Sequence, residues 1–146
     1  RRIENGEDAM PRTVSVLLLS GLLLLAAPVS QAQDGALIEG VISEQITAFQ
    51  ADDMEAAFAL ASPALRRLFR TSERFGQMVQ QGYPMVHRPQ SLRFLGRREV
   101  GGFVLQRVMV SDAEGRLHLL EYQMLQSGPG FVINGVRLIP AAGAGV

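Results

Sequence analysis

The spacing of apolar residues changes along the chain, and this change limits the possible folds more than any single motif does. Between residues 36 and 82, apolar side chains recur every three or four positions, whereas beyond Pro89 four apolar segments are separated by short breaks. A period near 3.6 predicts amphipathic helices, and short breaks between strands permit only antiparallel neighbours. The sequence therefore predicts an α+β domain, in which N-terminal helices pack on a four-stranded antiparallel sheet.

Polar residues that accept hydrogen bonds from backbone N–H groups indicate where the helices begin. The first helix is expected at residues 36–50. Three further starts are expected: a capping box of Asp52 with Glu55, Ser62 before Pro63, and Thr71 or Ser72. Gly82 is expected to end the last helix in a left-handed conformation.

The strands are expected at residues 91–98, 103–111, 116–125 and 131–139. The turn at 112–115 begins with Asp and ends with Gly, which suits a type I turn closed by a glycine bulge. Such a turn pairs Asp112 with Arg116. The predicted register then places three pairs opposite each other: Arg107 and Glu121, Gln106 and Tyr122, and Val110 and His118.

Residues 10–32 have the organisation of a secretory signal peptide. Arg12 precedes an uncharged run of 14 residues, and Ser30-Gln31-Ala32 offers a small-x-small cleavage site. The run is shorter than the roughly 20 residues that span a bilayer. We therefore expect an exported protein, periplasmic or secreted, that leaves the membrane after cleavage. The expected parts are upstream non-native sequence (1–9), the signal peptide (10–32), one domain (33–139) and a flexible tail (140–146).

The composition excludes several classes of function. The chain has 14 basic and 14 acidic residues, and this zero net charge gives no field for attracting nucleic acid. It contains no cysteine, and every basic residue is arginine, so thiolate and lysine chemistry are both excluded. With two histidines and no regularly spaced acidic ligands, we expect neither a metal site nor a cofactor.

Several short motifs between residues 42 and 138 resemble an exported bacterial family catalogued as a domain of unknown function. They include Gln45-Ile46, Ala57-Phe58, Ser62-Pro63, Tyr83-Pro84, Arg88-Pro89 and Tyr122-Gln123-Met124. That family lies within the nuclear transport factor 2-like (ketosteroid-isomerase-like) superfamily. The resemblance implies a curved sheet wrapped around N-terminal helices as a cone, with a pocket inside and a frequent dimeric state. Because the superfamily contains isomerases, cyclases, dehydratases and inert subunits, the fold does not decide the function.

The first candidate site is the proline-stiffened loop at residues 83–89. In a functional loop, Arg88 would hold an anionic group, and Tyr83 or His87 would donate a hydrogen bond. In the structural alternative, Tyr83 packs where the helices meet the sheet and Arg88 caps helical carbonyls. We expect no histidine–carboxylate pair, because His118 lies opposite Val110 and no acidic residue is near His87 in the sequence.

The second group of candidates lies on the two middle strands. Gln106, His118 and Tyr122 share one face with apolar residues, as in a pocket wall or in a core whose polar groups are satisfied. On the other face, Arg107 and Glu121 would form an ion pair. Glu121 in an apolar cavity would act as a general base, but Arg107 would lower its pKa; the alternative is a simple salt bridge.

Both faces of these strands carry large apolar residues, although N-terminal helices can cover only one face. A second copy, packed sheet against sheet about a two-fold axis, is the expected cover. The function that we expect is non-catalytic binding of a small ligand or a protein partner. One alternative is an isomerase or cyclase that uses Tyr83, His87 or Tyr122 as acid or base. The other is a structural dimerisation subunit.

Overall fold

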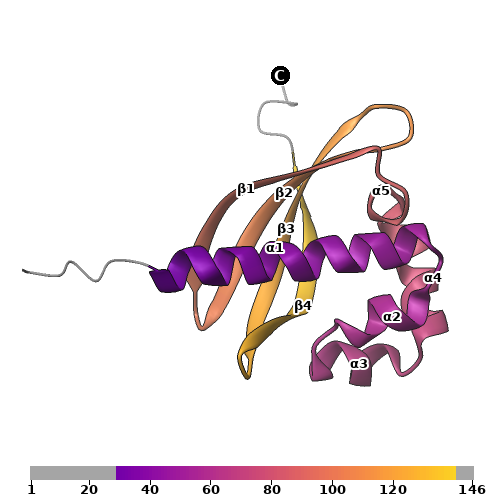
Figure 1. Ribbon diagram of the computed structural model, residues 1–146. Coiled ribbons are helices and arrows are strands. Elements are labelled where there is room, and N and C mark those ends of the chain that lie inside the picture. Colours follow the sequence, from indigo (N-terminus) through magenta and orange to yellow (C-terminus); the bar gives the residue numbers. More distant parts are fainter. Residues whose placement is uncertain (1–28, 141–146) are drawn as a thin grey trace, which may run out of the picture.

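Nine elements follow one another in the computed structural model, which describes residues 29–140 (Figure 1). The helices are α1 (Val29–Gln50), α2 (Met54–Ala59), α3 (Pro63–Phe69), α4 (Ser72–Gly82) and α5 (Pro84–His87). The strands are β1 (Ser91–Val100), β2 (Phe103–Ser111), β3 (Leu117–Ser127) and β4 (Gly130–Ile139). The strands form one antiparallel sheet in the order β1-β2-β3-β4, so the α+β fold predicted from the spacing of apolar residues is confirmed.

Most of the predicted signal peptide lies outside the described residues, as do the predicted upstream segment 1–9 and residues 141–146 of the predicted tail. The last four residues of that signal peptide, from Val29 to Ala32, form the first turn of α1. None of the described helices combines the length and the hydropathy of a membrane-spanning segment.

Helix α1 crosses one face of the sheet and supplies much of the core. Figure 1 shows it in front of the strands, with α2, α3 and α4 grouped near its C-terminal end. Ile38, Ile42 and Phe49 from α1 are buried in the same apolar cluster as Leu120 and Tyr122 from the sheet. Because those α1 positions follow the helical period, the amphipathic pattern of the sequence sets the face of α1 that meets the sheet.

The predicted start of α2 is wrong by one residue. Asp53, and not Asp52, is the N-cap, since its side chain accepts a hydrogen bond from the backbone N–H of Ala56 at 3.0 Å. Asp52 adopts a left-handed conformation with φ of 56°. This conformation turns the chain sharply after α1 and directs the carboxylate of Asp52 towards α5. The predicted caps of the next two helices, Ser62 and Thr71, are confirmed.

The segment predicted as a stiff loop at residues 83–89 contains the short helix α5. Gly82 is the last residue of α4 rather than a left-handed cap, and Tyr83 ends the helix with φ of −136°. Pro84 then occupies the first turn of α5, where a missing N–H group costs nothing. The helix therefore ends where the sequence predicted, but the predicted left-handed conformation of Gly82 is wrong.

The predicted β2–β3 register is confirmed for Arg107 and Glu121, Gln106 and Tyr122, and Val110 and His118. Gly115 has φ of 80°, and the N–H of Asp112 donates to the carbonyl of Arg116. The turn with Asp112 at its first position and Gly115 at its last therefore sets the register of β2 and β3, as expected.

Gln106 holds a bulge in β1, where the register with β2 shifts between Phe94 and Arg97. Its buried amide nitrogen donates to the carbonyls of Leu95 and Arg107, and its oxygen accepts from the guanidinium of Arg97. A buried polar side chain with all these partners stabilises the bulge. The role of Gln106 is therefore structural within the core.

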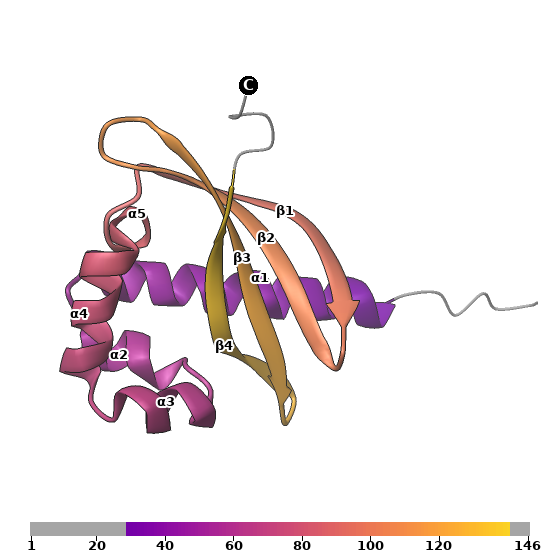
Figure 2. The ribbon, with the colours of Figure 1, turned by 180° about the vertical axis from the view of Figure 1, so that it is seen from behind.

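The two faces of the sheet differ in what covers them. Figure 2 shows the strands from the side opposite α1, and no helix of the described chain crosses the sheet there. Residues that alternate with the buried ones point to this side, which we call the outer face. Leu117, on the outer face, is 69% exposed, whereas Leu120, on the helix side, is fully buried. The apolar residues predicted on both faces are thus covered by helices on one face only.

Replacing Gln106 with Leu should destabilise the fold. The change removes the part-buried hydrogen bonds from Gln106 to the carbonyls of Leu95 and Arg107. Each such bond contributes about 0.5–1.5 kcal/mol, so the expected loss is about 1–3 kcal/mol. Urea unfolding should show a free energy of unfolding that is lower by that amount, with an unchanged m-value. Gln126→Leu is the matched control, because Gln126 is exposed on the same sheet. Equal stabilities of the two variants would contradict the bulge role of Gln106.

Candidate functional site

An apolar cavity of about 190 Å³ lies between the helices and strands β3 and β4. One wall carries Phe49, Phe69 and Phe75, which pack as tilted and edge-on aromatic rings. The opposite wall comes from the sheet and includes Ile133. Leu68 also lines the cavity and is 70% exposed, which places the opening beside α3.

A parallel bridge between the α2–α3 connection and β4 fixes the position of α3 beside the cavity. The N–H of Ser62 donates to the carbonyl of Ile133 at 2.8 Å, and the N–H of Ile133 donates to the carbonyl of Leu60 at 2.9 Å. The hydroxyl of Ser62 also donates to Asn134 at 2.8 Å, at the point where β4 bulges. These bonds hold the cavity mouth on the rigid sheet.

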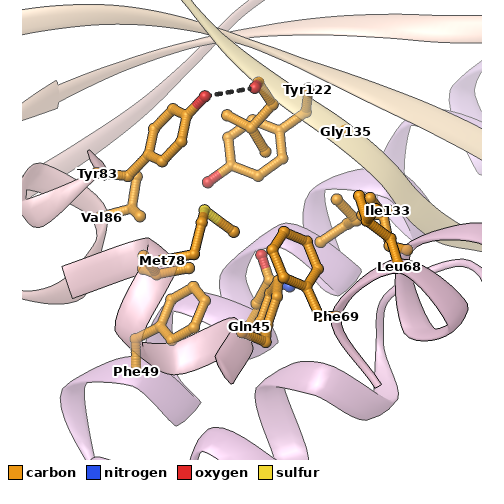
Figure 3. A pocket seen from close by; sticks show the side chains of 14 residues that line it. Gln45, Phe49, Leu68, Phe69, Met78, Tyr83, Val86, Tyr122, Ile133 and Gly135 are labelled. Carbon is orange, nitrogen blue, oxygen red and sulfur yellow. Dashed lines mark hydrogen bonds between the residues drawn. The ribbon is translucent and has the colours of Figure 1, made fainter. Parts of the chain in front are cut away.

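Tyr122 places a hydroxyl in this cavity without a protein partner. The side chain is fully buried, and its oxygen makes no hydrogen bond within the described residues. In Figure 3 the oxygen points into the space between Tyr83 and Met78. Burial raises the pKa of Tyr122, so the group stays a protonated phenol at neutral pH. Tyr122 therefore offers a hydrogen-bond donor to whatever occupies the cavity.

Two other polar side chains of the cavity, Tyr83 and Gln45, each make one hydrogen bond. The hydroxyl of Tyr83 donates to the carbonyl of Val136 at 3.0 Å, the bond drawn in Figure 3. The amide nitrogen of Gln45 donates to the carbonyl of Ala57 at 3.2 Å. None of the residues that line the cavity is charged. The cavity lining is thus mostly apolar, and the hydroxyl of Tyr122 is a free donor within it.

His87 and Arg88 lie outside this cavity lining and bind the turn after α1. Nε2 of His87 lies 2.8 Å from Oδ1 of Asp52, and Nη2 of Arg88 lies 2.7 Å from Oδ2. These bonds lower the pKa of Asp52, the largest contribution coming from the hydrogen bond to His87. Arg88 also donates to the carbonyl of Gln50, the last residue of α1. The helix-capping alternative for Arg88 is the arrangement found.

The expectation that no histidine pairs with a carboxylate is wrong for both histidines. His87 meets Asp52 across 35 positions of sequence, because the turn after α1 is folded against α5. Nε2 of His118 lies 2.8 Å from Oδ2 of Asp112, the first residue of the hairpin turn. The hydrogen bond to His118, together with bonds from Arg116 and Glu114, holds the pKa of Asp112 far below its usual value.

The structure thus divides the six predicted pocket residues. Tyr83 and Tyr122 line the cavity, whereas Gln106 holds the β1 bulge. His118 and Arg88 line a second pocket beside the hairpin turn, and His87, in α5, contacts the α1–α2 turn. Gln45 also lines the cavity. This position was not predicted, although a glutamine on the apolar side of an amphipathic helix indicates a buried polar group.

Glu121 and Arg107 form the predicted ion pair on the outer face, but the pair belongs to a larger cluster. The Glu121 side chain is only 1% exposed and receives hydrogen bonds from Arg98, Arg107 and Arg137. Burial raises the pKa of Glu121, but the hydrogen bonds from Arg137 and Arg107 outweigh burial and lower it. Glu121 is therefore an ionised, fully bonded carboxylate. Its arginines make it unsuited to act as a general base.

No group of three or more metal-ligating side chains is present in residues 29–140. The two histidine–aspartate pairs belong to different turns: Asp52 of the first pair lies in the α1–α2 turn, and Asp112 of the second lies in the β2–β3 turn.

Replacing Glu121 with Gln should lower stability at neutral pH and remove part of its pH dependence. Hydrogen bonds to charged groups contribute about 1.5–3 kcal/mol, and this range is the expected loss at pH 7. Because folding lowers the pKa of Glu121, its stabilisation is present above the ordinary pKa of 4.5 and is lost as the pH falls through the folded value. The two proteins should therefore converge in stability in acid, as measured by urea unfolding from pH 7 downwards.

Glu114→Gln is the control for this measurement. Glu114 is 67% exposed and bonds Arg116 on the surface, so its replacement should change stability little. A Glu121→Gln deficit that stays constant across the pH range would show that it does not arise from the charge of Glu121.

Comparison with known proteins identifies the family. No curated protein and no solved structure shows a significant match to the chain. A family model, described as Domain of unknown function (DUF4864), matches residues 31–146, which include every described helix and strand apart from the first two residues of α1. The chain therefore belongs to the DUF4864 family of domains of unknown function.

Proposed function

We propose that this protein binds a small, neutral, mostly apolar molecule in the cavity between its helices and strands β3 and β4. The observation that carries the proposal is the buried, unpartnered hydroxyl of Tyr122 at the cavity wall. A buried donor without a partner costs free energy, so natural cores rarely retain one unless something else binds it. A ligand with a single oxygen acceptor supplies that partner.

The size and lining of the cavity define the ligand. An engineered apolar cavity of about 150 Å³ binds benzene, so a cavity of about 190 Å³ has room for a ring compound of similar or slightly larger size. The three phenylalanines offer flat apolar contacts, and no lining residue offers a counter-charge. A charged ligand would be desolvated there without compensation.

These features favour binding over the isomerase or cyclase alternative. Proton transfer needs a base with a pKa near the working pH, and the cavity lining contains no carboxylate and no imidazole. The raised pKa of Tyr122 keeps its proton in place, which suits hydrogen bonding to a ligand rather than proton abstraction. His87, named as an acid or base in that alternative, is bound to Asp52 outside the cavity lining.

The position of the cavity also agrees with membership of the nuclear transport factor 2-like superfamily, which is part of this proposal. Helices cover one face of an antiparallel sheet that curves around α1, and the cavity lies between the two layers (Figure 1). The superfamily resemblance implied a pocket in this place. The specific content of the site, however, comes from the side chains of this chain alone.

Two probes of similar size test the proposal: cyclohexanone, which has an oxygen acceptor, and methylcyclohexane, which has none. Both should shift amide signals of cavity residues in an NMR titration of the labelled protein. Tyr122→Phe should weaken cyclohexanone binding roughly 2- to 12-fold, the value of one net hydrogen bond, and leave methylcyclohexane binding unchanged. Since the hydroxyl of Tyr122 has no protein partner, this variant should be at least as stable as the wild type.

Tyr83→Phe is the matched control, because it removes the other phenolic hydroxyl of the cavity. It should lose stability, since the bond to the carbonyl of Val136 disappears, and keep the cyclohexanone affinity. The proposal is wrong if neither probe shifts cavity residues, or if Tyr122→Phe weakens both probes equally.

We also propose that the protein is exported and that cleavage follows Ala32. The described residues from 30 to 33 are exposed, so cleavage there shortens α1 without opening the core. The mature protein should begin at Gln33. Intact-mass measurement of protein recovered from the periplasm or the medium tests this, and a full-length species held in the membrane fraction would contradict it.

A further inference from the structure

The outer face of the sheet carries many apolar side chains without a cover among residues 29–140. Register and alternation place there the side chains of Val100, Phe103, Leu105, Met109, Leu117, Leu119, Leu125, Val132 and Ile139. Figure 2 shows this side of the strands free of helices. Val100 and Leu117 are exposed, and the other seven side chains are half-buried. A group of accessible apolar side chains on one face is typical of an interaction site.

Positively charged residues outnumber negatively charged ones on the same face. Arg93, Arg98, Arg107 and Arg137 lie on it, whereas Glu121 is its only acidic residue within the sheet. The whole chain has no net charge, so this positive excess is a local property of the outer face. Arginine together with apolar residues, and a shortage of acidic ones, is the composition typical of the core of a protein interface.

Glu121 arranges three of these arginines for binding. Each guanidinium has five N–H groups in a planar fork, and Glu121 uses one from Arg98, one from Arg107 and two from Arg137. The side chains of these arginines are 51%, 45% and 67% exposed, respectively, although the carboxylate between them is buried. The remaining donors are therefore held close together and accessible, which reduces the entropy lost when they bind an anion.

We propose that the outer face docks a partner protein segment in which carboxylates alternate with apolar side chains. The carboxylates would bind the free donors of Arg98, Arg107 and Arg137, and the apolar side chains would cover neighbours such as Leu105 and Leu119. Carboxylates match the arginine fork geometrically and compensate the positive excess.

Charge argues against a second copy as the occupant. In a two-fold sheet-to-sheet dimer, the same face meets itself, so three arginines and one glutamate would face an identical set. Apolar residues lie on both sides of the cluster along β2 and β3, so burying them against a copy would bury the clusters as well. Desolvated like charges cost free energy. The homodimer predicted from the sequence is thus the rival outcome of the test.

Two synthetic peptides provide the probes: Ac-Val-Glu-Phe-Glu-Leu-amide and its glutamine counterpart Ac-Val-Gln-Phe-Gln-Leu-amide. In an NMR titration of the labelled protein, the glutamate peptide should shift the amides of β2, β3 and β4. It should bind at least tenfold more tightly than the glutamine peptide, and added salt should reduce this difference. Arg107→Gln should weaken its binding about tenfold, while Arg137 continues to bond Glu121 and keeps the sheet intact.

Arg67→Gln is the matched control, because it removes the same charge from an exposed position on α3 and should leave the affinity unchanged. Thermal unfolding verifies that both variants fold. The proposal is overturned by equal affinities for the two peptides, by the absence of binding, or by shifts confined to the helices. A stable dimer in light scattering at micromolar concentration would overturn it as well and assign the outer face to a second copy.

Discussion

The contact between α1 and one face of the sheet is the constraint on which the rest of the structure depends. Ile38, Ile42 and Phe49 enter the core only if α1 crosses the strands, and this crossing decides which side of every strand is buried. A shift of one residue in β2 or β3 would exchange the two faces completely. The hairpin turn at Gly115 prevents that shift, so a local turn and a long-range contact specify the same arrangement.

The division into two faces gives the molecule two surfaces of different chemistry. On the helix side, the space between α1, α3, α4 and the sheet is not completely filled, and the cavity that remains is apolar. On the outer side, apolar side chains surround a cluster in which Glu121 bonds three arginines. We propose a small neutral molecule for the first surface and an acidic protein segment for the second. Because β3 contributes Tyr122 to one surface and Glu121 to the other, the two surfaces share this strand.

Most of the helices, the four strands and the β2–β3 register could be predicted from the sequence because they depend on local chemistry. Residues that are close together in the sequence determine the helical period, the cap at Ser62 and the turn at residues 112–115. The histidine–aspartate pairs could not be predicted in the same way: the pair of His87 and Asp52 depends on how α5 packs against the end of α1. The cavity was expected only in outline, since the composition of a pocket wall resembles that of a filled core and only the packing distinguishes them.

The strongest support for a ligand contact at Tyr122 is the contrast between its unbonded hydroxyl and the fully hydrogen-bonded polar side chains buried near it. Gln106 and Glu121 are buried near it on β2 and β3, and each has hydrogen-bond partners for both of its terminal polar atoms. These polar groups are therefore satisfied in full, whereas the fully buried hydroxyl oxygen of Tyr122 has no hydrogen-bond partner within the described residues. Phenylalanine would supply the same ring to the core without a buried hydroxyl to desolvate. The structure shows no contact by which this hydroxyl stabilises the fold, and its position at the cavity wall supports the proposal that it bonds a ligand.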